Sequence, residues 1–231
     1  MKKKIFFAAI AVVLIVAISV AGTLAVMTKT TGSVTNTFTA KGGIIDPEDT
    51  DAFTLKEHEP TWNDTSKKYT GLSSTEKTSV TYDHASPKME IPKDPTIKVN
   101  LMVDASAYLF VKVEDTTGGF ITSSMASGWN ATAVETGTNY KIYAYSTVLV
   151  GTENSATNAE YPAIQVLAGG TDTFTTGKVT VTDYDESDTT SLTPAADGTI
   201  TFGALTFTAY LVQAEGFDTA AAAWAGSGFA A

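Results

Sequence analysis

The sequence lacks two residue types altogether, since none of its 231 residues is a cysteine or an arginine. Without cysteine, neither disulfides nor thiolate chemistry contribute, so stability must come from packing, hydrogen bonds, bound ions or assembly. Without arginine, and with a formal net charge of −10, the surface is a poor match for nucleic-acid phosphates, which bind clusters of lysine and arginine. Anionic lipid surfaces are disfavoured for the same reason.

Histidine is also scarce, because the chain holds only His58 and His84. Both lie beside acidic residues in polar sequence, and neither belongs to a His-Glu-x-x-His motif. A hydrolytic zinc site normally takes three protein ligands and keeps one position open, and a serine hydrolase with a nucleophile elbow needs Gly-x-Ser-x-Gly. The sequence contains neither pattern. It therefore predicts no catalytic residue, no resident cofactor and no enzyme activity.

One long apolar run is present, and it lies at the N-terminus. Three lysines, at positions 2 to 4, precede an uncharged stretch from Ile5 to Ala21, and small residues follow. This order is typical of a secretory signal peptide. We expect a signal helix at residues 1–25, cut by a signal peptidase between Ala25 and Val26. The alternative is an uncleaved membrane anchor, because about 20 apolar residues can span a bilayer.

Cleavage at that point changes the charge of the chain. It leaves 12 of the 15 lysines against all 25 acidic residues, a formal net charge of −13. Such a charge favours solubility of the free subunit and leaves room for divalent cations to screen repulsion. We expect a secreted protein, in the extracellular matrix or at the cell surface, that meets the membrane only through its signal peptide.

What dominates the rest of the chain is threonine, valine, glycine and aromatic residues in alternation of period two. Apolar residues alternate with others in five segments, which are residues 97–103, 107–113, 140–148, 178–182 and 199–212. This spacing fits half-buried β-strands, and Gly118-Gly119, Gly169-Gly170 and Asp197-Gly198 supply turns between them. The pattern predicts an all-β fold, an antiparallel β-sandwich with long loops.

Two segments depart from the alternation. Residues 46–94 are polar, proline-punctuated and rich in lysine and acids, which predicts weak strands joined by long loops. Near the C-terminus, Asp218 precedes a run of four alanines and Trp224. Asp is a favoured N-cap, so we expect a short C-terminal helix capped by Asp218, held to the body by Phe217 and Trp224.

The segment from Thr199 to Val212 has fourteen residues without a charge or a proline. Such a segment pairs strongly with any free strand edge. Two interpretations stay open: a central strand pair buried within a monomer, or a strand that borders a groove meant for another molecule.

Acidic residues gather in two places. Asp183, Asp185, Glu186 and Asp188 follow one predicted strand, while Asp46, Glu48, Asp49 and Asp51 form an earlier group. Oxygen-rich loops can bind Ca²⁺, so Asp183, Asp185 and Asp188 are weak calcium candidates. The spacing departs from a calcium loop, with no glycine at the sixth position and Pro194 at the twelfth. A solvated acidic turn is the simpler interpretation.

Several segments together resemble the TasA/camelysin family of exported proteins. They are Gly22 to Ala25 with Val34 to Ala40, then Lys93 to Asn100, Ala107 to Glu114, and Gln213 to Thr219 leading to Ala223-Trp224. The resemblance implies export by a Gram-positive bacterium through a dedicated signal peptidase. It also implies a jelly-roll subunit that polymerises into biofilm matrix fibres, the N-terminal segment of one subunit completing the sheet of the next. One branch of the family carries a metallopeptidase label, for which this chain lacks a zinc motif.

The residues support such a mechanism independently of the resemblance. Val34, Asn36, Phe38 and Ala40 share one face of a short strand that carries no charge, and Gly42-Gly43 can act as a hinge. A strand at a free terminus can leave its own domain and pair with another sheet. We expect residues 26–43 to be a mobile donor strand and hinge, and residues 44–231 to form the jelly-roll-like domain.

Three functions follow from these patterns. The first is a structural subunit that assembles head to tail with copies of itself, with no nucleic-acid partner. The second is a monomeric adhesion or ligand-binding sandwich at the cell surface. The third is a camelysin-like secreted metallopeptidase, which would require His58 and His84 to approach each other.

Overall fold

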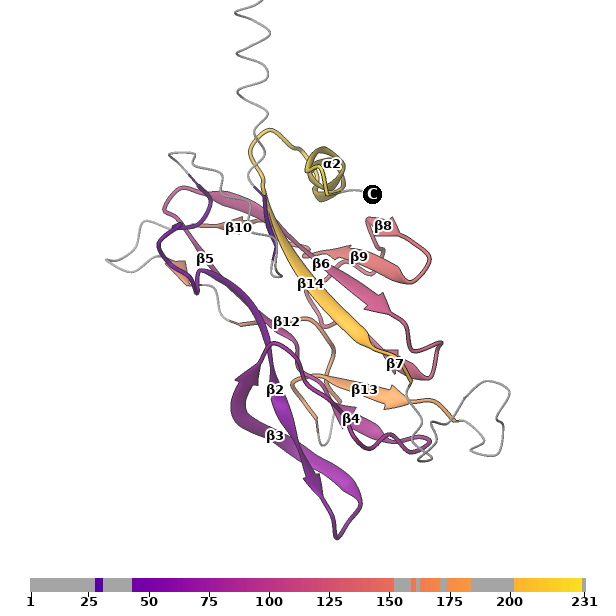
Figure 1. Ribbon diagram of the computed structural model, residues 1–231. Helices are drawn as coiled ribbons and strands as arrows, with labels where there is room; N and C mark the ends of the chain where they lie inside the picture. Colours follow the sequence, from indigo (N-terminus) through magenta and orange to yellow (C-terminus); the bar gives the residue numbers. More distant parts are fainter. Residues whose placement is uncertain are drawn as a thin grey trace, which may run out of the picture.

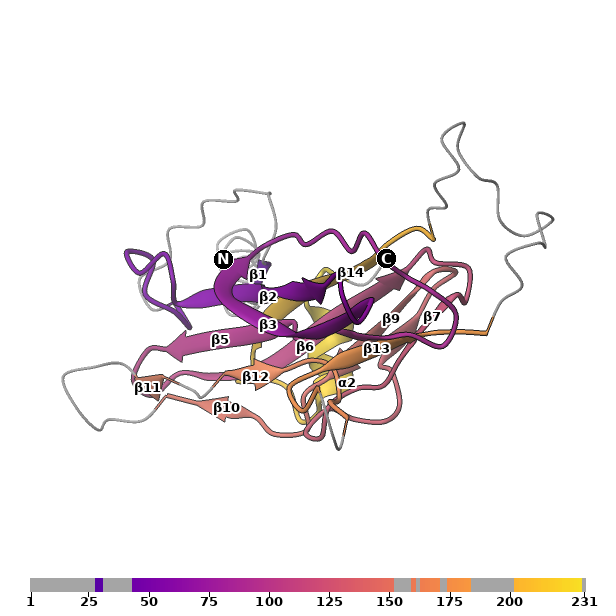
Figure 2. The same ribbon diagram turned by 90° about the horizontal axis from the view of Figure 1, so that it is seen from below.

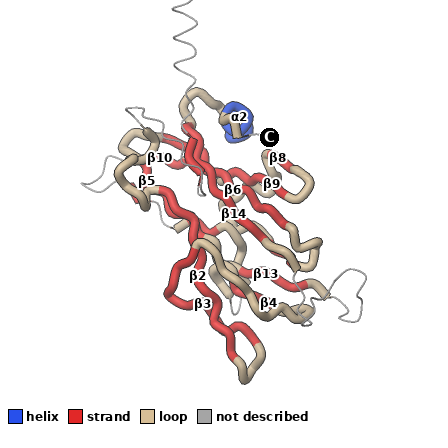
Figure 3. Tube along the Cα trace, viewed as in Figure 1, coloured by secondary structure: helices blue, strands red, loops and turns tan. Residues whose placement is uncertain are grey.

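The computed structural model describes residues 28–30, 43–151, 159–160, 163–170, 174–183 and 202–229. Strands are the main regular structure among these residues, and every strand pair among them is antiparallel. One short helix, near the C-terminus, accompanies them (Figure 3). The prediction of an antiparallel all-β fold with a short C-terminal helix is therefore confirmed. The expected signal helix, the cleavage site and the donor strand lie outside the described residues.

The largest sheet is built around two long strands. β6 (Ser106–Asp115) and β14 (Leu205–Gln213) pair over nine residues, and the sheet order is β1-β14-β6-β9-β8, with β10 also paired to β6. The other strands of this sheet are β1 (Thr28–Thr30), β8 (Glu135–Thr136), β9 (Tyr140–Ala144) and β10 (Leu149–Val150).

Two smaller sheets are formed by the other described strands. The second has the order β11-β5-β2-β3, with β12 also paired to β5, and the third has the order β4-β13-β7. Their strands are β2 (Phe53–Asn63), β3 (Lys68–Lys77), β5 (Thr96–Leu101), β11 (Ala159–Glu160), β12 (Ile164–Gln165), β4 (Glu90–Pro92), β7 (Ile121–Ser123) and β13 (Lys178–Val181). Figures 1 and 2 show how these layers lie against one another.

The main core lies between the sheets, where alternate side chains meet. Ile97, Val99 and Leu101 of β5 are buried, and so are Leu109 and Val111 of β6. The strand faces predicted from the alternation at these positions are confirmed. The opposite face of β6 is also covered, because fully buried Phe110 packs in a second cluster with Trp224 of helix α2 (Ala220–Gly226).

Two sequence predictions are wrong. Residues 46–94 contain two of the longest strands described, β2 and β3, which form a hairpin at the end of the molecule opposite α2 (Figure 1). The backbone amides of Thr65 and Ser66 close its turn by donating to Asn63 Oδ1, at 2.9 Å each. The N-cap of α2 is Thr219 rather than Asp218, because Thr219 Oγ1 accepts from the amide of Ala222 at 3.1 Å.

Candidate functional site

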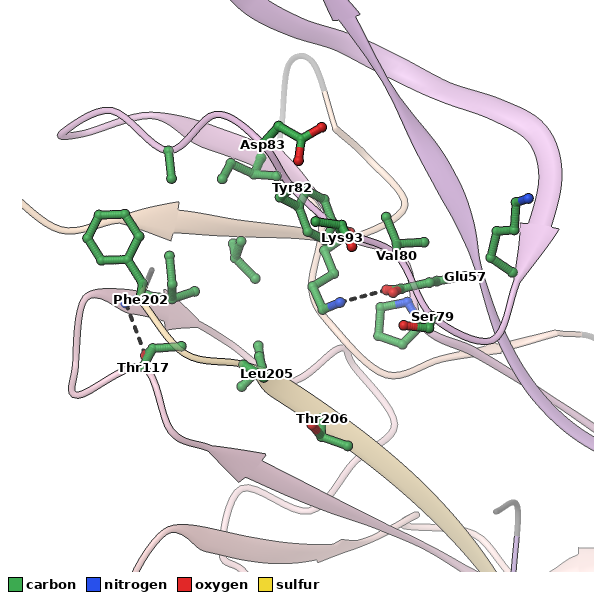
Figure 4. Close-up of a pocket in the computed structure, with 18 of the residues that line it drawn as sticks. Glu57, Ser79, Val80, Tyr82, Asp83, Lys93, Thr117, Phe202, Leu205 and Thr206 are labelled. Atoms are coloured by element: carbon green, nitrogen blue, oxygen red, sulfur yellow. Dashed lines mark hydrogen bonds and ion pairs between the residues drawn. The ribbon is translucent and has the colours of Figure 1, made fainter. Parts of the chain in front are cut away.

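A groove of about 1260 Å³ runs between the start of β14 and the chain that follows the β2–β3 hairpin. One wall consists of residues 202–207, and the other includes residues 77–86 together with Leu55 and Glu57 of β2. Figure 4 shows Leu205 and Thr206 on one side and Tyr82 on the other, with Lys93 extended between them. Within the segment from Thr199 to Val212, residues 202–207 border this groove, whereas Ala209, Leu211 and Val212 are fully buried.

A buried ion pair lies in the wall of this groove. Lys93 Nζ is 2.7 Å from Glu57 Oε2, and only 8% and 11% of the two side chains are exposed. The ammonium also lies 5.1 Å from the centre of the Tyr82 ring and 5.4 Å from that of Phe207. The two rings shield the Lys93 ammonium from bulk water, and cation–π attraction offsets part of the free-energy cost of its desolvation.

Asp94 makes a second polar connection beside the first. Its carboxylate accepts from the His58 amide at 2.9 Å through Oδ1, while Oδ2 lies 2.8 Å from His58 Nδ1. Asp94 is 4% exposed. Glu57 and His58 of β2 are therefore held to Lys93 and Asp94, between β4 and β5, by two adjacent contacts. These contacts fix one wall of the groove relative to β2.

Aromatic residues line the outer part of the same wall. His84 stacks on Trp62 with ring centres 3.8 Å apart, and its amide donates to the Tyr69 hydroxyl at 3.3 Å. Tyr82 is partly buried and packs against the main core. Burial, with smaller contributions from the carboxylates of Glu57 and Asp94, raises the pKa of Tyr82 well above its ordinary value. Its buried hydroxyl has no hydrogen-bond partner among the described residues.

The candidate metal ligands do not come together in the described structure. His58 contacts Asp94 and His84 stacks on Trp62, and no group of three or more His, Asp and Glu side chains in the described ranges could hold a metal ion. Asp183 forms an exposed ion pair with Lys88 at 2.7 Å, while Asp185, Glu186 and Asp188 lie outside those ranges.

The earlier acidic group stabilises a turn. Asp46 and Asp49 accept from the amides of Glu48 and Asp51, at 2.9 and 3.0 Å. Asp49 also accepts from Asn100 Nδ2 at 3.2 Å, which connects the turn to β5. These carboxylates have a local structural role, as the simpler interpretation of acidic turns predicts.

Sequence reasoning did not find the groove, because its polar residues come from distant positions. Lys93 and Asp94 are separated by 36 residues from Glu57 and His58. The available signal in the sequence was the pair Lys93-Asp94, two charged residues just before the predicted strand that begins at Ile97. Both are buried.

Neither a family model, nor a curated protein, nor a solved structure matches this chain. Within the described residues, no helix has the length and hydropathy that crossing a membrane would require.

Proposed function

We propose that this chain is a secreted structural subunit with a jelly-roll-like domain, which assembles by donor-strand exchange into extracellular fibres of a Gram-positive biofilm matrix. The observation that carries the proposal is the outer edge of β14. Among the described residues this edge is paired only by β1, at Tyr210 to Val212. The part of the edge from Leu205 to Phe207 borders the groove.

The backbone groups that this edge offers follow from two hydrogen bonds. The carbonyl of Ala204 accepts from the Thr116 amide at 3.0 Å, and the amide of Ala214 donates to Ser106 at 2.9 Å. In an antiparallel ladder every second residue bonds to the same neighbour, so even-numbered residues of β14 bond toward β6. The amide and carbonyl of Leu205 and Phe207 then point to the outer edge, where the described residues provide no partner strand.

An added strand at this position would gain both main-chain and side-chain contacts. Leu205 and Phe207 pack partly buried against the main core, so the inward side chains of an added strand would enter the groove beside them. Strand addition of this kind takes affinity from main-chain hydrogen bonds and register from side-chain pockets. Head-to-tail addition does not close on itself, and it therefore produces filaments.

The sequence supplies the other half of the interaction. Residues 34–40 have an apolar face with Val34 and Phe38, they carry no charge, and they follow the proposed cleavage after Ala25. Removal of the signal peptide would free this segment from the membrane. The resemblance to the TasA/camelysin family supports the same assignment, and the subunit is its own partner, with no catalytic step.

The proposal is tested on the mature chain, residues 26–231, by electron microscopy over time with and without calcium. We expect fibres from this chain and none from a chain that lacks residues 26–40. Replacement of Phe38 by glutamate, which keeps the length of the segment, should also prevent assembly, because a carboxylate would take the place of the largest apolar side chain of the segment beside Leu205 and Phe207. Fibres of normal abundance from either variant, or single particles from the mature chain at high concentration, would refute the proposal.

A further inference from the structure

The short strand β1 covers only part of the outer edge of β14. It lies antiparallel to residues 210–212, and the described residues provide no strand opposite Leu205 and Phe207, farther along the same edge. Even-numbered residues of β14 bond toward β6, so Leu211 and its partner Lys29 form the hydrogen-bonded pair of the β1 register. β1 is therefore a terminal strand that few main-chain bonds hold to a long neighbour.

Such a strand can leave its sheet at low cost. Each main-chain hydrogen bond contributes only modestly to stability, because the released groups bond to water instead. Chain ends with few contacts open at free energies far below that of global unfolding. β1 also begins at Thr28, the third residue after the proposed cleavage at Ala25, so the cleaved chain has no long segment on that side to hold it in place.

The chain that follows β1 is long enough for the strand to reach a second copy. Twelve residues, 31–42, connect Thr30 to Gly43 and lie outside the described ranges. Their number alone sets the reach, which is about 45 Å when the chain is fully extended. This length is comparable with the diameter of a compact domain of this size. β1 can therefore pair with β14 of an adjacent copy while the domain that begins at Gly43 stays folded.

We propose that β1 is exchanged between subunits: it pairs with β14 of its own subunit in the free monomer and with β14 of a second copy in the fibre. This inference rests on the proposed function and adds its regulation, because each monomer covers the part of the edge that its neighbour must occupy. The main-chain bonds are the same in both pairings, so the subunit concentration decides between them. A β1 from a second copy that continues in the same direction next reaches the outer-edge amides of Phe207 and Leu205.

A disulfide that fixes β1 to β14 tests this exchange, and the absence of native cysteine makes the engineered bond unambiguous. Thr28 and Val212 are directly opposite and form a non-hydrogen-bonded pair, with Cα atoms about 4.5 Å apart, a separation that a disulfide spans. The mature chain with Thr28→Cys and Val212→Cys is oxidised as a dilute monomer. We expect this locked monomer to form no fibres, and reduction with dithiothreitol to restore fibre growth.

A disulfide elsewhere separates the exchange from the general effect of a cross-link. Glu90 of β4 and Thr180 of β13 are also directly opposite and non-hydrogen-bonded, and neither strand pairs with β14. The variant with Glu90→Cys and Thr180→Cys should form fibres in the oxidised and the reduced state alike. Thr30→Cys with Tyr210→Cys is a second lock on β1 and should act like the first, which covers the case that Val212→Cys weakens the cluster beneath α2.

The same cysteines report the pairing inside the fibre. Fibres grown from the reduced variant with Thr28→Cys and Val212→Cys, and then oxidised, should give a ladder of disulfide-linked multimers on a non-reducing gel. Monomer bands alone from these fibres would overturn the inference, as would growth of both locked monomers at the rate of the oxidised Glu90–Thr180 control. Absence of fibres from the parent chain would instead refute the proposed function, on which the exchange depends.

Discussion

The buried ion pair between Glu57 and Lys93 stabilises one wall of the groove. Glu57→Gln removes the carboxylate and leaves the Lys93 ammonium buried between two rings. We expect this change to lower the free energy of unfolding by about 3–5 kcal/mol, the usual cost of breaking a buried ion pair at one end. Urea unfolding followed by tryptophan fluorescence measures the change.

The neighbouring strand offers a matched control for this prediction. Glu76 of β3 contacts Lys56 at 3.4 Å and Lys98 at 3.5 Å, but its side chain is 35% exposed. Glu76→Gln should therefore change stability by only about 0–1 kcal/mol. Equal effects of the two substitutions would contradict the interpretation of Glu57 and Lys93 as a buried pair. Replacement of Glu57 by leucine together with Lys93 by methionine should recover most of the stability that Glu57→Gln loses.

At the scale of elements, helix α2 depends on one capping side chain. Thr219→Ala removes the hydroxyl that accepts from the Ala222 amide and should destabilise the protein by about 1 kcal/mol. Asp218→Ala is the control, because Asp218 precedes the cap, and it should change stability little. The same urea titration compares them, and a larger effect of Asp218→Ala would show that the sequence-based choice of N-cap was right.

The apolar alternation of the sequence predicts some strands well and misses others. Alternation identified the buried faces of β5 and β6, because those side chains meet one continuous core. It did not identify β2, because the polar residues Glu57 and His58 have partners 36 residues away. Alternation gave no sign that Phe110, on the opposite face of β6, would also be buried, because the helix that covers this face lies more than 100 residues further along the chain.

For the whole molecule, the order of strands lay beyond sequence reasoning. β6 pairs with β14 at a separation of about 100 residues, and β5 pairs with β2 across the entire β2–β3 hairpin. Periodicity reports which face of a strand is buried, but it carries no information on the neighbouring strand. The groove depends on which strand is left at the edge, so it could be inferred only from the assembled sheets.

The whole fold also determines how the protein responds to alkali. Burial raises the pKa of Tyr69, Tyr82 and Tyr210, while the hydrogen bond to Glu135 at 2.6 Å is the main cause of the raised pKa of Tyr140. An unfolded tyrosine titrates near pH 10. Above that pH the unfolded chain releases protons that the folded chain keeps, so the stabilisation present below about pH 10 is lost as the pH rises toward the folded pKa values.

We therefore expect tyrosinate absorbance at 295 nm to lag behind that of the urea-denatured chain and to rise together with unfolding. Tyr82→Phe should move this alkaline transition to higher pH, because it removes a strongly shifted hydroxyl that has no hydrogen-bond partner among the described residues. Tyr69→Phe is the comparison, since the Tyr69 hydroxyl accepts from the His84 amide and its removal also costs that bond. Coincident titration of the folded and denatured chains, with a Tm that does not change between pH 9 and 11, would show that these tyrosines are not buried as described.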